Sequence, residues 1–459
     1  MNITNVFADR KIKSNFMIAF IAVIAATGGL LFGFDTGVIS GALLFIKQDW
    51  PLSSFAQGCI VSSVLVGAVL GSLCSGKLTD HFGRKAVIFA TAIIFFIGSI
   101  ATAASPSPEL LMLFRIIIGI AIGVASYTVP LYISEISPDE SRGALVSLNQ
   151  LAITIGILVS YFVDNYFASF DSGWRYMMLA GAAPAVILAL GMLILPNTPR
   201  WLVSKNYTEE AKKVLKQIDS DSDPDKTITQ IKKSMDDSTQ GNLNELLQPW
   251  LRPALLIGIA LMFFQQVTGI NTVIYYAPTI FQMAGFQSAS AAISATVGVG
   301  IINVLLTIVS IRLIDKVGRK PLLYIGLSGM IVSLLALGLA FYSTAALGGL
   351  LKWFTVGGLF VYIASFAISL GPICWLIIAE IYPTRIRGLA MSIATVTNWG
   401  FNLVVALTFL PMIDKLGQSG TFLFFALISI LGLIFCYKYV PETKGVSLED
   451  IEQNWRKAA

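Results

Sequence analysis

The chain has 459 residues, of which 56% are apolar and only 12% charged, and its net charge is +5. Soluble globular proteins carry about 25% charged residues, so this composition excludes an ordinary soluble fold. Apolar runs of about 20 residues recur along the chain, and each is long enough to cross a bilayer as a helix.

These runs predict an all-α polytopic membrane protein with twelve transmembrane helices. No small-residue cleavage site follows the N-terminal MNITNVFADRKIKSNF, so we expect a retained first helix and not a removed signal peptide. In chain order, the predicted spans cover residues 17–46, 55–76, 86–105, 110–132, 144–167, 176–195, 253–283, 289–311, 321–343, 353–379, 388–411 and 420–438.

The positive charges are distributed unequally between the two sides that these spans define. With both termini on one side, only four of the 31 Lys and Arg residues lie on the other side, and Arg115 lies within a span. Lys and Arg accumulate in cytoplasmic loops, so we expect cytoplasmic termini in a multi-pass protein of the cell membrane. This topology accounts for the positive charge without nucleic-acid binding. The four residues are Lys47, Arg175, Lys352 and Lys415.

The longest polar stretch separates six spans from six. We expect a six-helix bundle over 1–196, a cytoplasmic linker over 197–250, a second bundle over 251–440 and a cytoplasmic tail over 441–459. Apolar residues recur at helical spacing in the linker, which predicts short amphipathic helices beneath the membrane. These residues are Ala211, Val214, Leu215, Ile218, Ile228, Ile231 and Met235.

The two halves contain the same motifs in the same order. SGKLTDHFGRKAVIF (75–89) matches SIRLIDKVGRKPLLY (310–324), and SEISPDESRG (134–143) matches AEIYPTRIRG (379–388). Each half has an even number of spans, so both repeats enter the membrane in the same direction. A parallel repeat of this kind predicts a binding site between the halves.

With these motifs the chain resembles the sugar porters of the major facilitator superfamily, which include bacterial proton–xylose, proton–galactose and proton–glucose symporters and the animal glucose facilitators. The resemblance extends from about Thr27 to Ser447 and rests on a combination of motifs. It implies a major facilitator fold, a hexose or pentose as cargo, and protons as the coupling ion with no other cofactor. The motifs are GGLLFGFDTGVISG, DHFGRK, RIIIGIAIG, YISEISPDESRG, PNTPRWLV, QQVTGIN, DKVGRK, GPICWLIIAEIYPTRIRG and VPETKG.

Acids and bases recur together at the cytoplasmic helix ends of both halves. Such charges can pair when the ends are close, as in an outward-facing state, and separate when the halves rock apart. We therefore predict a cytoplasmic gate, with solvated topology signals as the alternative. Its residues are Asp80, Arg84, Lys85, Glu135 and Arg142, and in the second half Asp315, Arg319, Lys320, Glu380 and Arg387.

Only Asp35 and Arg115 are expected to carry formal charges deep within the spans. A charge at the bilayer centre costs about 2.5–3.5 kcal/mol on insertion scales, so we expect these two residues to pair. Burial favours the neutral acid and a nearby guanidinium favours the carboxylate, so movement of Arg115 would load and unload a proton on Asp35. The alternative is an ion pair that only fixes helix packing.

The resemblance implies the same role. Proton-coupled sugar porters carry an aspartate at the position of Asp35, whereas the animal facilitators that resemble this chain carry an asparagine. The xylose symporter has a second acid after its WRYM motif, where this chain has Gly181. Some proton-coupled relatives also lack that acid, so coupling is expected to rest on Asp35.

Amide and aromatic residues in the spans suit a sugar, which presents hydroxyls on all sides and one weakly apolar face. Buried amides should line a cavity, and interhelical hydrogen bonding is the alternative. At positions that match the family's sugar contacts, the expected site comprises Gln150, Gln265, Gln266, Asn271, Asn303, Phe366, Gly371, Trp375, Asn398, Trp399 and Asn402.

Three residues, Gly269, Gly371 and Pro372, are expected to let spans 7 and 10 break over a ligand. Tyr275 and Tyr276 are expected at an extracellular gate, with plain packing as the alternative.

The predicted function is proton-coupled monosaccharide symport by a monomer that works by alternating access. The alternatives are an uncoupled sugar facilitator and a membrane sugar sensor that does not transport. An enzyme is not expected, because the sequence contains no nucleophile–base pair, metal-ligand cluster or phosphate-binding loop.

Overall fold

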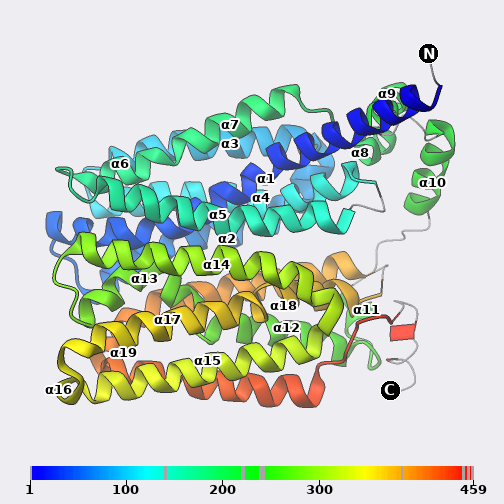
Figure 1. The fold of residues 1–459 in the computed structure, drawn as a ribbon. Helices are drawn as coiled ribbons and strands as arrows, with labels where there is room; N and C mark the ends of the chain where they lie inside the picture. Colours follow the sequence, from blue (N-terminus) through cyan, green and yellow to red (C-terminus); the bar gives the residue numbers. More distant parts are fainter. Residues whose placement is uncertain are drawn as a thin grey trace.

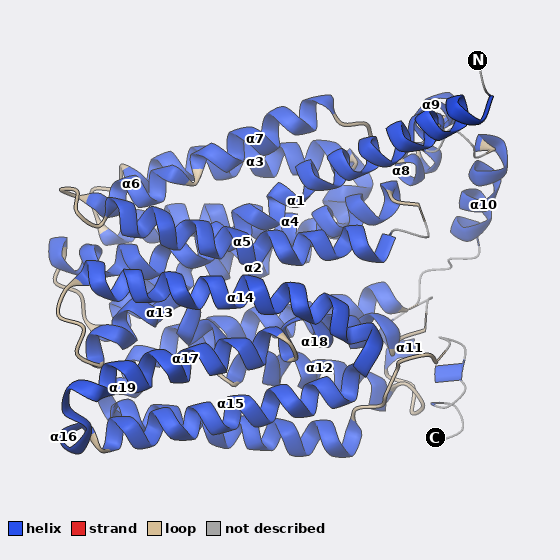
Figure 2. Ribbon diagram, viewed as in Figure 1, coloured by secondary structure: helices blue, strands red, loops and turns tan. Residues whose placement is uncertain are grey.

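The computed structural model describes the backbone of residues 3–138, 142–218, 223–236, 243–383, 386–446, 450–451 and 455. Within these ranges, the side chains of residues 3–16, 234, 236, 243–244 and 315 are not described. The described chain is helical and contains no strand (Figure 2).

In the described part of the chain, the first half contains seven helices that form six spans. The sixth span is divided at Gly181, where α6 ends and α7 begins. The pairs α1 with α5, α2 with α4, and α3 with both α4 and α7 pack together. The helices are α1 (Ile3–Asp49), α2 (Ser54–Phe82), α3 (Arg84–Ala103), α4 (Pro108–Ile136), α5 (Arg142–Phe167), α6 (Gly173–Ala180) and α7 (Ala182–Ile194).

Four short helices follow the first half. The predicted apolar face is buried at Ala211, Val214 and Ile218, and again at Ile228. α8 and α9 pack against each other, and α10 packs against both. The helices are α8 (Pro199–Ser204), α9 (Thr208–Ile218), α10 (Pro224–Asp236) and α11 (Leu243–Leu246).

Among the described residues, the second half contains eight α-helices and one short 3₁₀ helix. They are α12 (Arg252–Val267), α13 (Ile270–Met283), α14 (Ala289–Val317), α15 (Arg319–Tyr342), α16 (Thr344–Leu347), η1 (Gly348–Leu350), α17 (Leu351–Ala367), α18 (Leu370–Glu380) and α19 (Arg387–Tyr439).

Twelve membrane crossings result from these helices. Among the described residues, eleven helical segments are long and apolar enough to cross a membrane, and the last of them is α19 with 53 residues. A straight helix of that length would measure about 80 Å, far more than a bilayer. Gly417, with φ 70° and ψ 171°, interrupts α19, so it forms two spans.

Two spans of the second half are broken near their middle. Span 7 breaks between α12 and α13 at Gly269, whose φ of 98° favours glycine, as the sequence predicts. The break in span 10 lies at Ser369, with φ −129° and ψ −102°, and not at Gly371 and Pro372. Those two residues belong to the first turn of α18, where a proline removes no helical hydrogen bond.

In Figure 1, α8–α11 and the start of α1 lie at one end of the bundle, which we call the terminal side, and α6 and α16 lie at the opposite end, the far side. Hydrogen bonds connect the halves towards the far side. Lys47 donates to Gln282 (3.3 Å), Tyr161 to the carbonyl of Ile274 (3.0 Å), and Ser294 to Asn165 (2.7 Å).

The terminal side is more open between the halves. Helix α5 packs against α1 in its own half and against α14 in the other half. Despite this central position, no side chain of α5 from Arg142 to Ile153 is buried, whereas every side chain of α13 from Ile270 to Phe281 is buried. The halves therefore meet at the far side and leave α5 accessible from the terminal side.

Candidate functional site

Asp35 on α1 and Arg115 on α4 form a buried ion pair within the first half. The exposed fractions of the two residues are 4% and 0%, and Nη2 of Arg115 lies 3.5 Å from Oδ2 of Asp35. The arginine also donates from Nε to the carbonyl of Ile60 at 3.1 Å, which ties it to α2. Nη1 has no hydrogen-bond partner among the described residues. The described structure therefore shows a single contact between the two charges, and Nη1 of the guanidinium remains without an acceptor.

A chain of amide side chains crosses the second half. Asn271 on α13 donates to Gln266 (2.6 Å), and Gln266 on α12 donates to Asn398 on α19 (3.1 Å). Asn398 donates in turn to Gln265. Gln265 donates to the carbonyls of Leu370 (2.8 Å) and Gly371 (3.1 Å), at the start of α18. Four of the predicted sugar-binding amides thus meet at the two broken spans.

Tyr275 is hydrogen-bonded to a further predicted sugar-binding amide. Its hydroxyl accepts a hydrogen bond from Asn402 (3.4 Å), whose other amide atom, Oδ1, is buried with no partner in the described part of the chain. Helix α13, which carries Tyr275, packs against α1, which carries Asp35. Tyr276 donates to the carbonyl of Ala406 (2.8 Å) and is fully buried.

Five other predicted sugar-binding residues have no described side-chain hydrogen bond to this cluster. Among the described contacts, neither Gln150 nor Asn303 is bonded to the amide chain through its side chain. Trp399 packs against Phe32 of the first half with ring centroids 5.3 Å apart. The other two aromatic residues, Phe366 and Trp375, are half-buried.

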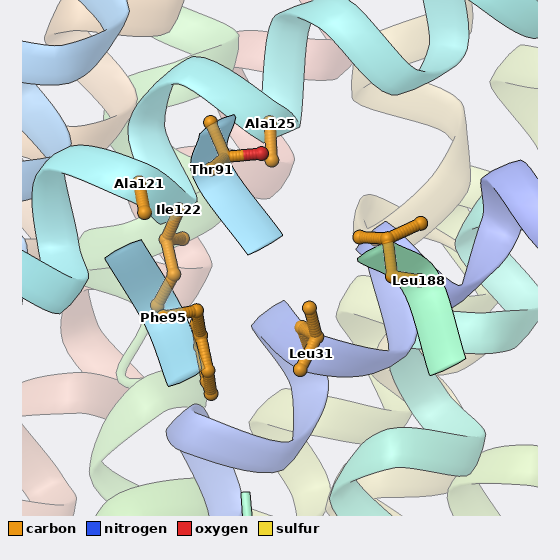
Figure 3. A pocket seen from close by; sticks show the side chains of 8 residues that line it. Leu31, Thr91, Phe95, Ala121, Ile122, Ala125 and Leu188 are labelled. Carbon is orange, nitrogen blue, oxygen red and sulfur yellow. The ribbon is translucent and has the colours of Figure 1, made fainter. Parts of the chain in front are cut away.

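A separate apolar pocket lies within the first half, between α1, α3, α4 and α7 (Figure 3). Its lining includes Leu31, Phe95, Ile122 and Leu188, and the hydroxyl of Thr91 already donates to the carbonyl of Ile88 (2.8 Å). A sugar needs several unpaired donors and acceptors, so this pocket does not suit one.

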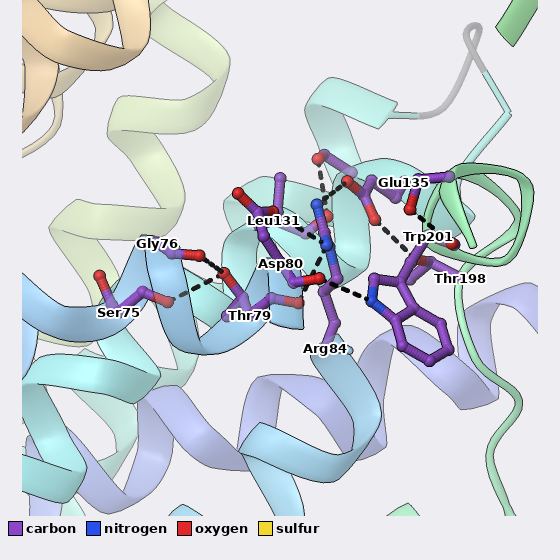
Figure 4. Close-up of polar contacts among 11 residues, drawn as sticks. Ser75, Gly76, Thr79, Asp80, Arg84, Leu131, Glu135, Thr198 and Trp201 are labelled. Atoms are coloured by element: carbon purple, nitrogen blue, oxygen red, sulfur yellow. Dashed lines mark hydrogen bonds and ion pairs between the residues drawn. The ribbon is translucent and has the colours of Figure 1, made fainter. Parts of the chain in front are cut away.

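Five residues, three from the first half and two from the segment that follows it, form a polar network at the terminal side (Figure 4). Arg84 contacts Asp80 (3.2 Å) and Glu135 (2.9 Å), and Thr198 donates to the second oxygen of Glu135 (2.6 Å). Trp201 donates its indole N–H to the carbonyl of Asp80 (3.2 Å). These bonds join α2, α3 and α4 to the segment around α8.

The second half repeats this network. Arg319 contacts Glu380 (2.9 Å), and the hydroxyl of Thr443 donates to the other oxygen of Glu380. The carboxylate of Glu442 accepts backbone N–H bonds from Arg319 (3.1 Å) and Lys320 (2.9 Å) at the start of α15. Partial burial raises the pKa of Glu442, but backbone N–H bonds outweigh it and hold that pKa below its usual range.

These threonines and Glu442 are polar partners that the sequence motifs alone did not reveal. PNT at 196–198 and PET at 441–443 are 245 positions apart, the same offset that separates Glu135 from Glu380. This shared offset of 245 positions could have identified Thr198 and Thr443 as equivalent residues of the two halves. Each described ion pair of these networks joins two residues of the same half, and none connects the two halves. Any gating must therefore act through movement of whole helix ends.

The other predicted gate residues have individual contacts. Lys85 donates to the carbonyl of Leu193 (3.1 Å), Arg142 to that of Ser134 (3.0 Å), and Arg387 to that of Tyr382 (3.3 Å). Lys320 lies over the ring of Tyr324 at 6.0 Å. The side chain of Asp315 is outside the described part of the chain.

The structure buries a further acid that the sequence motifs did not indicate. Asp164 lies within the predicted fifth span and is fully buried. Its Oδ2 accepts the N–H of Gly41 (3.1 Å), and its Oδ1 has no partner among the described residues. Asp164 lies only three residues before the end of α5, a position where the sequence suggests exposure to water. Its burial results from packing against α1 and could not be predicted from the sequence.

The chain matches the family model described as sugar (and other) transporter over residues 21–455. It is 46% identical over 449 residues to the putative metabolite transport protein YwtG of Bacillus subtilis, covering 97% of this chain and 96% of that protein. It is 39% identical over 446 residues to the galactose–proton symporter of Escherichia coli K12, covering 96% and 95%.

The fold is similar to the inward-open conformation of the xylose transporter XylE from E. coli. The TM-score is 0.83 at 34% identity, and the match covers 95% of this chain and all of that one. An opening at the terminal side agrees with this similarity. With its two six-span halves and repeated motifs, the chain belongs to the sugar transporter family of the major facilitator superfamily and is a transporter, not an enzyme.

Proposed function

We propose that this protein is a proton-coupled monosaccharide symporter of the cell membrane, working as a monomer with its terminal side in the cytoplasm. The observation that carries the proposal is the buried pair of Asp35 and Arg115 together with the amide chain that begins at Asn271 on α13, a helix that packs against α1. A relative named as a galactose–proton symporter supports the same combination of cargo and ion.

Coupling requires the proton affinity of Asp35 to differ between the two open states. When Arg115 is close, its charge favours the carboxylate, and when it moves away, burial favours the neutral acid. In the conformation described here, the two side chains are 3.5 Å apart and the protein is open at the terminal side. Release of the proton towards the cytoplasm fits this arrangement.

Sugar binding would replace hydrogen bonds within the amide chain. Gln265, Gln266, Asn271 and Asn398 now satisfy one another, so a sugar that enters between them exchanges amide–amide bonds for amide–hydroxyl bonds. Because Gln265 holds the first turn of α18 through two carbonyls, this exchange would also move the broken tenth span. Cargo in the second half would then bias the same rocking motion that the ion pair biases in the first half.

The test is uptake of labelled glucose, galactose, xylose and arabinose by cells that express this chain, with and without a protonophore. We expect accumulation of one of these sugars that the protonophore abolishes. Accumulation would contradict a sensor, and equilibration that the protonophore does not change would identify an uncoupled facilitator.

A further inference from the structure

Helix α5 carries a buried acid that the proposed cycle does not use. Asp164 has no exposed surface and lies three residues before the end of α5. It is pressed against α1, since a Cβ atom added to Gly41 would lie only 2.5 Å from its Oδ2. Its Oδ2 accepts a hydrogen bond from the backbone N–H of Gly41, and its Oδ1 is buried without a partner among the described residues.

The charged groups of α1 and α6 whose side chains are described are engaged elsewhere. On α1, Asp35 pairs with Arg115 of α4, Lys47 donates to Gln282, and Asp49 accepts the indole N–H of Trp174. On α6, Arg175 donates to the carbonyls of Ala103 and Ser105, at 2.8 Å each.

Among the described residues, no ion pair joins Asp164 to a cation of the second half. α13 contributes Tyr275, and the charged residues of α14 (Arg312, Asp315 and Lys316) belong to its opposite end. Tyr161 lies one turn away on α5 and carries no positive charge. A buried carboxylate without a cation is far more costly than the neutral acid, so the protonated form is favoured in this conformation.

Asp164 lies between two hydrogen bonds that join the halves at the far side. Tyr161 donates to the carbonyl of Ile274 (3.0 Å), and Asn165 accepts from Ser294 (2.7 Å). Both bonds have to break when the halves separate there. Separation would admit water to Asp164, and a hydrated carboxyl group loses its proton at neutral pH.

We propose that Asp164 is a second proton-binding site, occupied while the extracellular contact between the halves is closed and vacated when that contact opens. This proposal rests on the alternating access and orientation of the proposed function, but not on any role of Asp35. Gly41, its bonding partner on α1, lies six residues beyond Asp35, about 9 Å nearer the extracellular end. The proton comes from extracellular water and returns to it, so it adds nothing to the number of protons transported.

The direction of the pH effect follows from proton linkage. The closed contact holds one more proton than the open contact, so a lower external pH favours closure. The shift is at most about tenfold in the closed-to-open ratio per pH unit. External acid would therefore favour the inward-facing state independently of the Asp35 pair.

The first test measures closure directly in the full-length protein in liposomes. Spin labels on cysteines at Ser169 and Gln287, both exposed in the loops beside the contact, report the distance between the halves in a Cys59→Ser, Cys74→Ser background. All variants carry Asp35→Asn, so that residue 35 cannot bind or release a proton in the pH range measured. We expect closure to increase as pH falls, the dependence to vanish with Asp164→Asn, and the dependence to persist with Asp171→Asn, an exposed acid in the next loop.

Unchanged pH dependence in the Asp164→Asn variant would overturn the proposal. A second measurement needs no substitution at Asp164. The infrared spectrum of Asp35→Asn at neutral pH should retain the carbonyl band of a protonated, buried carboxyl group, and absence of this band would also refute the site. Neither readout involves sugar uptake, so failure of proton coupling at Asp35 would be recognised separately.

Discussion

Arg115 and Asp35 face each other inside the first half, with Nη2 of the arginine 3.5 Å from Oδ2 of the aspartate and both side chains buried. The arginine is anchored to the carbonyl of Ile60 and retains an unpaired Nη1 in the described structure. A small helix movement can therefore change the distance between the charges without unfolding their surroundings.

Replacement of Asp35 by asparagine should uncouple transport. An amide side chain at this position cannot exchange a proton, so sugar-driven alkalinisation outside proteoliposomes should disappear while sugar counterflow persists. The measurement is external pH and labelled-sugar exchange on the same preparation. Asp171→Asn, which removes an exposed acid, should leave both activities intact. Proton uptake that survives in the Asp35→Asn variant would remove Asp35 from the coupling step.

Alanine substitutions in the amide chain should weaken sugar binding. Gln265→Ala, Gln266→Ala and Asn271→Ala should each cost about 1–3 kcal/mol, because each leaves buried partners unpaired. The side chains of Gln266 and Asn271 are bonded to each other, so the double variant should lose less than the sum of the single variants.

Binding to these variants can be measured by calorimetry on purified protein. Gln287→Ala, in an exposed loop, provides an amide control that should bind sugar normally. Unaltered affinity in all three single variants would place the sugar elsewhere.

The two terminal-side networks should differ in their contribution to stability. The side chains of Arg84 and Glu135 are 9% and 5% exposed, whereas those of Arg319 and Glu380 are 11% and 22% exposed. Removing one partner of a buried pair costs about 3–5 kcal/mol, and less where water reaches the charge left behind. Glu135→Ala should therefore lower the thermal midpoint more than Glu380→Ala, and equal or reversed shifts in a thermal unfolding assay would contradict this ranking.

Gly269→Ala should disturb the break in span 7. Gly269 has φ 98°, and an added Cβ would lie 3.0 Å from the ring of Phe425. A left-handed backbone conformation alone costs about 1–2 kcal/mol with a side chain. We expect lower thermal stability and weaker sugar binding, while Gly400→Ala, in a helical position with open space, should be nearly neutral. Wild-type affinity in Gly269→Ala would show that the break does not shape the site.

Most of the fold could be predicted from local patterns. Apolar runs of membrane length defined the spans, because an isolated backbone in lipid must satisfy its hydrogen bonds as a helix. The break at Gly269 followed from residue type, whereas the break of span 10 appeared at Ser369, before the glycine and proline that suggested it. A proline in the first helical turn is compatible with a helix start, so its presence did not locate the break.

The sequence by itself determined the helical membrane fold, the repeated halves and the residue types of the amide cluster, because hydropathy and motif spacing are properties of the linear chain. Only the tertiary structure decided that Gln265, Gln266, Asn271 and Asn398 bond to one another, that the described gate pairs lie within each half, and that Asp164 is buried. These features depend on how helices distant in sequence pack together, and burial and pairing arise from that packing alone.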